Sequence, residues 1–249
     1  MLSAILTENV FGLKFDYLLT LSLEKMKTKT IIMASAATLA VGTVAQSCLA
    51  VATSSIGLSL IKNILLGGIT KGLGVFKNKD AFLQNNLIDQ AMPQSLRQVN
   101  SILGTVAPNL VTKQREYIAQ AAAYTVNVSE PILVNAVNSL TAEDVNRIVT
   151  GGNGMATQIL KEKTSAQLVN AILPKVDEKL NEFGIVKSVN TALQGSSLLN
   201  SIFGGSNNNL SASGGISRLA SEQLVNGLFS IIKDYEETHS ADIRKAIGK

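Results

Sequence analysis

The stretch that most constrains the fold lies at residues 140–168, LTAEDVNRIVTGGNGMATQILKEKTSAQL. Thr141 stands three residues before Asp144, a spacing that lets both side chains bond the free backbone N–H groups of a helix start. Thr164 stands at the same spacing before Gln167 and predicts a second helix start. The stretch therefore predicts helices that begin at defined residues and pack against each other.

Between these two predicted starts lies a glycine-rich break, Gly151-Gly152-Asn153-Gly154. Glycine reaches positive φ at low cost, so Gly151, Gly152 and Gly154 allow one helix to stop and the next to leave in a new direction. A phosphate-binding loop would need a preceding strand and a following Lys-Ser or Lys-Thr pair, and the sequence has neither. We therefore interpret the glycines as a helix break.

Apolar residues recur at helical spacing along most of the chain, and no alternating run of β-branched residues bounded by turns is present. The sequence therefore predicts an all-α fold, a single-domain multi-helix bundle. Helices are expected at residues 54–66, where later glycines weaken the pattern, from Pro93 until Pro108 ends the helix, and from Thr112 onward. Residues 77–92 are expected to be a loop with one helical turn, 196–215 a flexible Gly/Ser/Asn loop, and 216–237 the last long helix.

The amino-terminal region has the pattern of an export signal. Residues 26–29 are basic in part, and residues 30–44 are uncharged and apolar or small, a run too short to span a bilayer. The run ends Val44-Ala45-Gln46-Ser47-Cys48, which resembles a bacterial lipobox and implies cleavage before Cys48 and lipidation of this cysteine. An ordinary secretory signal with an incidental cysteine is the alternative.

These features predict four consecutive regions. Residues 26–47 are the lipoprotein-type signal peptide, 48–53 a tether and 54–249 the helical domain. Residues 1–25 contain three acids and fit no signal, so we expect translation to begin at Met26 and this upstream extension to be wrongly assigned. Recovery of peptides from residues 1–25 in native protein would contradict that expectation.

Composition excludes several classes of site. The chain has one cysteine and one histidine, which excludes a disulfide framework and a multi-cysteine or histidine-rich metal centre. The net charge of +4 comes from dispersed lysines and arginines, whereas a nucleic-acid binder has a basic stripe. We predict no metal, no cofactor and no nucleic-acid partner.

Several spaced motifs resemble one bacterial family. They are Met92-Pro93 with Leu96-Arg97, Leu140-Thr141 with Asp144, Ile148 and Gly151, Ala156-Thr157 with Leu160, then Leu168, Pro174 and Leu180, and Gly227-Leu228-Phe229 with Glu236. Over residues 60–237 the chain is similar to the family known as domain of unknown function 4197. The resemblance implies a secreted or envelope-facing helical domain without an assigned activity. Where the family typically has Asn-Arg-Ala-Ala-Glu, this chain has Ala119-Gln120-Ala121-Ala122-Ala123, so any chemistry of those polar residues would be absent here.

Three carboxylates are candidates for catalysis. Asp144 in the first turn of a helix could act as an acid, but such a residue more simply caps the helix and interacts with its dipole. Asp234 and Glu236, beside Glu237 and His239, could form an acid–base pair or a weak metal site, but we interpret them as a solvated face of the terminal helix. No nucleophile motif is present, so no catalytic residue is predicted.

The combined prediction is a non-enzymatic envelope lipoprotein, attached through lipidated Cys48 to a membrane, facing the periplasm and anchored in the outer membrane. Its helical domain would bind an apolar ligand (a lipid or fatty acid) or scaffold a protein partner that the sequence does not identify. The alternatives are a hydrolase-like enzyme that uses Asp144, Asp234 and Glu236, and a protein whose helix at residues 54–76 acts on a membrane surface. The residues expected to line an apolar ligand are Leu133, Val137, Ile148, Leu160, Ile172, Leu228 and Phe229.

Overall fold

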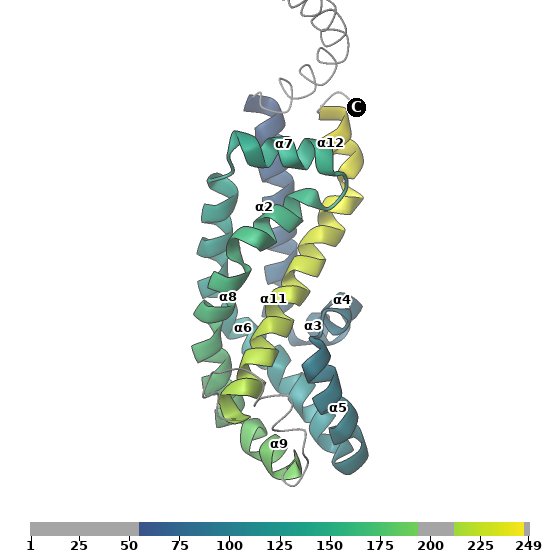
Figure 1. Cartoon of the computed structure of the whole chain (residues 1–249), viewed down its shortest axis with the longest axis vertical. Helices are drawn as coiled ribbons and strands as arrows, with labels where there is room; N and C mark the ends of the chain where they lie inside the picture. The colour runs from purple at the N-terminus through teal and green to yellow at the C-terminus, as the bar shows by residue number, and fades with distance from the viewer. Residues whose placement is uncertain (1–54, 194–211, 247–249) are drawn as a thin grey trace, which may run out of the picture. The chain divides into compact units, whose positions relative to one another are not determined.

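The computed structural model describes residues 55–193 and 212–246, all of which belong to one compact unit, Val51–Lys249. Every regular element within these ranges is a helix (Figure 1), which confirms the predicted all-α multi-helix fold. The elements are α2 (Ser55–Lys77), α3 (Lys79–Leu83), α4 (Asn86–Gln90), α5 (Gln94–Val106), α6 (Pro108–Asn138), α7 (Ala142–Gly151), α8 (Met155–Glu182), α9 (Ile185–Leu193), α11 (Ala212–Thr238) and α12 (Ser240–Ala246).

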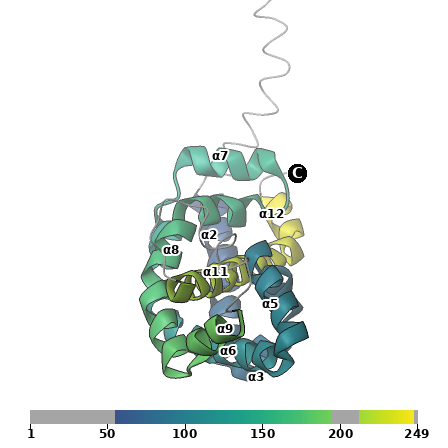
Figure 2. The ribbon, with the colours of Figure 1, turned by 60° about the horizontal axis from the view of Figure 1, so that its bottom comes forward.

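The four long helices form the body of this unit. Contacts join α2 to α6, α6 to α8, α8 to α11 and α11 back to α2, so the four close into a bundle around one core. Helix α7 crosses the direction of the long helices at one end, and α5 and α9 lie at the other (Figures 1 and 2). The largest fully buried side chains are Phe76, Ile61, Leu65, Ile88, Leu96, Leu103, Leu133, Ile159, Leu160, Leu168, Ile172 and Leu180.

Helix α2 continues well past its predicted end near residue 66. A Cβ atom on Gly67 would lie 2.8 Å from the ring of Tyr235, and one on Gly68 would lie 3.1 Å from Cγ2 of Ile232. The glycines thus let the backbone of α2 approach α11 more closely than any other residue would allow. The packing gained in this way offsets the poor helix propensity of glycine, of about 1 kcal/mol per residue.

The predicted end of the helix at Pro108 is confirmed, because α5 ends at Val106 with Ala107 as its C-cap. The predicted start of the next helix at Thr112 is wrong, because α6 begins at Pro108 itself. Proline is well accepted there because a first-turn residue has no intrahelical use for its N–H group. Pro131 and Pro174 lie inside α6 and α8, and both helices continue past them.

Residues 77–92, predicted to be a loop with one turn of helix, form two short helices. The side chain of Asn78 accepts a hydrogen bond from the backbone N–H of Ala81 at the start of α3, and that of Asn85 accepts one from Leu87 at the start of α4. Each asparagine satisfies a backbone donor that would otherwise be free.

The helix start predicted at Thr164 is also wrong. Thr164 lies in the interior of α8, is 2% exposed, and donates its hydroxyl to the carbonyl oxygen of Leu160 at 2.7 Å. Helix α11 begins at Ala212, four residues before the predicted start. The remainder of the predicted loop (residues 196–211), the regions 1–25, 26–47 and 48–53, and Cys48 lie outside the described residues.

Candidate functional site

The start of α7 contains the predicted capping box. The backbone N–H of Asp144 donates to the hydroxyl of Thr141 at 3.2 Å, and the backbone N–H of Thr141 donates to Oδ2 of Asp144 at 2.8 Å. Nζ of Lys163, on α8, lies 2.9 Å from the same carboxylate oxygen. Asp144 is only 5% exposed. The carboxylate therefore caps α7 and also joins α7 to α8.

Burial alone would raise the pKa of Asp144, because it penalises the charged form. The hydrogen bonds from the Thr141 amide, the Lys163 ammonium and the Thr141 hydroxyl outweigh this effect, and the pKa of Asp144 is lowered. The ionised carboxylate of Asp144 therefore stabilises the fold at pH values above the ordinary aspartate pKa. This stabilisation is lost as the pH falls through the lowered pKa of the folded state.

We expect Asp144→Asn to lower the free energy of unfolding at pH 7 by about 1–2 kcal/mol, because a cap is lost and Lys163 loses its partner. The difference from wild type should shrink at pH 3, which lies below the ordinary aspartate pKa, because the carboxylate of the unfolded chain is then largely protonated. Urea unfolding at both pH values measures it, with Glu143→Gln, an exposed neighbour, as the control. An equal difference at pH 7 and pH 3 would contradict the assigned role of the charge.

The glycine break separates α7 from α8 as predicted. Gly152 has a φ of +88° and Gly154 a φ of +80°, whereas Gly151 ends α7 with a negative φ. A Cβ atom on Gly154 would lie 2.7 Å from Cε of Lys233, but this is the end of a flexible side chain, so the positive φ is what favours glycine here. Gly154 is the N-cap of α8 and has no side chain to bond the free N–H groups of the first turn.

Glu236, from α11, supplies the missing cap. Its Oε1 accepts from the backbone N–H of Ala156 at 3.0 Å, and its Oε2 accepts from the backbone N–H of Thr157 at 2.7 Å and from the Thr157 hydroxyl at 2.6 Å. Glu236 is 2% exposed, so our interpretation of it as part of a solvated face is wrong. A carboxylate at a helix N-terminus is stabilised by the N–H groups and by the helix dipole.

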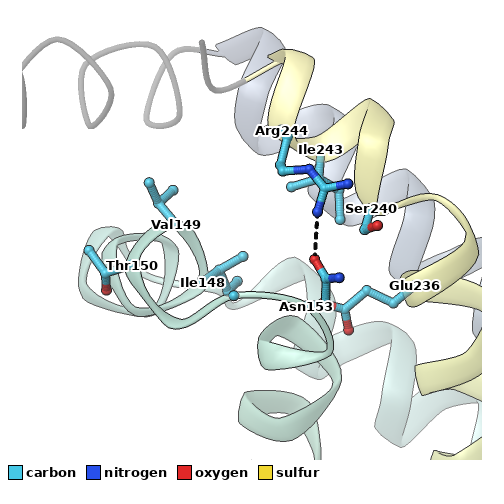
Figure 3. A pocket seen from close by; sticks show the side chains of 9 residues that line it. Ile148, Val149, Thr150, Asn153, Glu236, Ser240, Ile243 and Arg244 are labelled. Atoms are coloured by element: carbon cyan, nitrogen blue, oxygen red, sulfur yellow. Dashed lines mark hydrogen bonds between the residues drawn. The ribbon is translucent and has the colours of Figure 1, made fainter. Parts of the chain in front are cut away.

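A cavity of about 170 Å³ lies beside this cap, between α7, the glycine break and α12 (Figure 3). Ile148, Val149 and Ile243 form apolar walls, and Nη1 of Arg244 donates to Oδ1 of Asn153 at 3.0 Å. The volume is close to that of an engineered protein cavity of about 150 Å³ that binds benzene. Pockets for drug-sized ligands are larger, about 300–1,000 Å³.

The three candidate carboxylates, Asp144, Asp234 and Glu236, lie in different parts of the bundle and have different partners. Asp234 pairs with Lys71 of α2 at 3.0 Å, and both side chains are 46% exposed. The cavity beside Glu236 is lined by neither Asp144 nor Asp234. The ring of His239 stacks on Tyr235, and its Nδ1 lies 2.8 Å from the Tyr235 carbonyl oxygen. Within residues 55–193 and 212–246, no three His, Cys, Asp or Glu residues are grouped as a metal site would require.

The seven residues proposed as an apolar lining all belong to the buried core cluster, which comprises Leu133, Val137, Ile148, Leu160, Ile172, Leu228 and Phe229 among others. Ile148 also lines the cavity beside Glu236, and Phe229 lines a second cavity between α8 and α11. Leu228 packs against Gly72, where a Cβ atom would lie 2.5 Å from its Cδ1. The structure thus does not bring the seven together around one cavity.

Residues Gly57–Lys77 of α2 are long and apolar enough to cross a membrane by length and composition, the sole such segment among the described residues. Ile61, Leu65 and Ile69 are at most 2% exposed, because they pack inside the bundle. The same apolar composition is therefore accounted for by a core helix.

The sequence did not reveal the role of Glu236. A weak signal was available, because α8 starts after Gly154 and no hydroxyl or carboxyl side chain at its N-cap could bond the N–H groups. Such a helix start requires a partner from elsewhere in the fold. Nothing in the sequence indicates that the partner lies 79–80 residues away on α11.

These features define the class of the domain: an all-α bundle in which a glycine break and a glutamate from a distant helix fix the junction of two helices. The chain belongs to the family described as "Protein of unknown function (DUF4197)", whose model matches residues 50–248. The resemblance found in the sequence motifs is thereby confirmed. No curated protein and no solved structure matches the chain.

Proposed function

We propose that the protein is a non-enzymatic lipoprotein of the bacterial envelope, whose helical domain is a scaffold held at the periplasmic face of the outer membrane through lipidated Cys48. The lipobox-like sequence before Cys48 supports the tether. Acyl chains would hold the domain at a leaflet because each buried methylene contributes about 0.8 kcal/mol.

The non-enzymatic part of the proposal rests on the hydrogen bonds of Glu236. Both of its carboxylate oxygens accept hydrogen bonds from the first turn of α8. A general acid or base must reach its substrate with a free oxygen or proton. Asp144 caps α7 and pairs with Lys163 through Oδ2, a structural role that gives the hydrolase alternative no support.

The cavities favour a scaffold over a protein that encloses a lipid chain. The cavity beside Glu236, of about 170 Å³, is small for an acyl chain. Among the larger cavities, those of about 310 and 360 Å³ have charged residues such as Lys161, Lys233 and Arg218 in their lining. A cavity of about 240 Å³ has apolar residues in its lining together with Gln114, Gln223 and the Arg115–Asp89 pair. Since an acyl chain needs a continuous apolar wall, we retain the apolar-ligand version only as the alternative to be tested.

We expect wild-type protein produced in its own host to incorporate an alkyne-labelled fatty acid and to fractionate with the outer membrane. Cys48→Ala should lose both the label and the membrane association, because the acceptor thiol is absent. Ser54→Ala, just after the tether, is the matched control and should behave as wild type. Labelling that persists in Cys48→Ala, or is absent from wild type, would refute the tether.

Mass spectrometry of the purified protein separates the two versions of the proposal. The scaffold version predicts that solvent extraction releases no lipid other than the chains attached to Cys48. A stoichiometric free lipid or fatty acid would instead establish the apolar-ligand version.

A further inference from the structure

Another cavity, of about 240 Å³, lies where α5, α6 and α11 meet the short helices α3 and α4. We call it the carboxamide cavity, because the side chains of Asn100, Gln114 and Gln223 line it together. They come from three helices: α5 and α6, which follow each other in the sequence, and the distant α11. Phe82 and Ile118 are among the apolar residues that form the rest of its wall.

The three carboxamides carry buried polar atoms that no described residue satisfies. Gln114 is 1% exposed, and neither its Nε2 nor its Oε1 has a hydrogen-bond partner. Oε1 of Gln223, a residue 3% exposed, and Oδ1 of Asn100 are in the same condition. Burial of a polar atom without a partner is destabilising, so such groups are uncommon in folded proteins and need an explanation.

We explain these unpaired amide atoms by the position of their side chains around one cavity. A single orphaned amide could reflect local packing, but here three amide side chains line one cavity. Nδ2 of Asn100 lies 3.4 Å from Sδ of Met92, whereas the oxygen of the same amide has no partner. A molecule in the cavity that both donates and accepts hydrogen bonds would supply partners to the amide groups that turn toward it.

The charged groups at the cavity indicate a neutral ligand. Arg115 and Asp89 both line it, and they neutralise each other: Nε of Arg115 donates to Oδ1 of Asp89 at 3.1 Å, and Nη2 donates to Oδ2 at 2.7 Å. Nη2 also bonds the carbonyl oxygen of Leu83. A guanidinium with these partners has little left to offer an anion, and the paired carboxylate has little to offer a cation.

The wall is also held in a fixed shape, which favours binding. Helix α4 packs on α11 so closely that a Cβ atom on Gly227 would lie 3.1 Å from Cγ1 and 3.2 Å from Cα of Ile88. Ile88 is fully buried and directly precedes Asp89. The ion pair that closes this part of the cavity therefore stands on a rigid element.

We propose that the carboxamide cavity binds a small, neutral, polyhydroxylated molecule of about the size of a monosaccharide. Each hydroxyl group can donate and accept, so it matches a carboxamide in either orientation of its oxygen and nitrogen. The C–H faces of a sugar ring suit the apolar walls at Phe82 and Ile118. A volume of about 240 Å³ exceeds that of a cavity that holds benzene and lies just below the range for drug-sized ligands.

This inference concerns the folded bundle and does not depend on lipidation of Cys48. The test is isothermal titration calorimetry of the full chain with glucose, galactose and N-acetylglucosamine. Gluconate and glucosamine serve as charged analogues. We expect saturable binding of at least one neutral sugar and at least tenfold weaker binding of the corresponding charged analogue.

Gln114→Leu should weaken that binding by about tenfold or more, because an apolar group of similar size replaces two hydrogen-bonding atoms. Gln223→Leu provides a second variant in case the first does not fold, and circular dichroism checks both. Gln120→Leu, on the same helix but outside the cavity lining, is the matched control and should bind as wild type.

Three results would overturn the proposal. Absence of saturable binding of all three neutral sugars to wild type would mean that the carboxamides hold only water. Equal binding by wild type and by both folded leucine variants would place the sugar elsewhere. Tighter binding of a charged analogue than of its neutral counterpart would overturn the assignment of a neutral ligand.

Discussion

Replacement of Glu236 by alanine is expected to lower the free energy of unfolding by about 3–5 kcal/mol. The substitution leaves the buried backbone N–H groups of Ala156 and Thr157 and the Thr157 hydroxyl without an acceptor. Each unsatisfied buried donor costs about 1–3 kcal/mol. Because the carboxylate belongs to α11 and the donors to α8, the loss should also loosen the contact between these two helices.

Urea unfolding followed by circular dichroism measures this effect. Glu236→Gln should be milder than alanine, since it keeps one carbonyl oxygen but turns an NH₂ group toward a backbone donor. Glu237→Ala is the matched control: Glu237 is 46% exposed and pairs with Lys233 at 3.6 Å, so its loss should change stability by less than about 1 kcal/mol. Equal effects at positions 236 and 237 would show that the cap does not stabilise the fold.

The second large effect is expected at the contact between α2 and α11. Gly68→Leu should lower the free energy of unfolding by about 3 kcal/mol, because a Cβ atom would already lie 3.1 Å from Cγ2, 3.2 Å from the carbonyl oxygen and 3.3 Å from Cα of Ile232. Two of these atoms belong to the backbone and cannot move aside as a flexible side chain can. The helices would have to separate.

Gly74→Leu, on the same helix, is the control. No heavy atom lies within 4 Å of a Cβ atom built there, so leucine should raise stability by about 0.5–1 kcal/mol through its better helix propensity. Thermal and urea unfolding of the two variants give the comparison. A neutral Gly68→Leu would mean that α2 does not pack on α11, and it would revive the membrane-surface interpretation of this helix.

The local rules worked where a helix end is decided by neighbouring residues. Thr141 and Asp144 form their capping box from a spacing of three, and Gly152 and Gly154 adopt positive φ in the break that separates α7 from α8. The same rules failed at Thr164, which has the spacing of a cap but lies inside α8. A cap motif cannot start a helix where the chain is already helical and buried on one face, because the hydroxyl is then satisfied by the preceding turn.

At the candidate site, too, the sequence predicted the local contacts but not the contacts between distant helices. The sequence identified Asp144 and Glu236 as notable carboxylates, and it predicted the helix-capping role of Asp144 from local spacing. It did not predict that Lys163 would reach Asp144 from another helix, nor that Glu236 would be buried. The carboxamide cavity was not predicted at all, since amides on three separate helices carry no shared motif.

By itself the sequence determined the helical class of this protein, the break between α7 and α8, the cap of α7 and the family to which the chain belongs, because each depends on residues close together along the chain. The tertiary structure decided which buried polar groups meet: Glu236 with α8, Lys163 with Asp144, and the three carboxamides around one cavity. The physical reason is that a buried polar atom must find its partner in space, and helix packing brings together residues that sequence distance keeps apart.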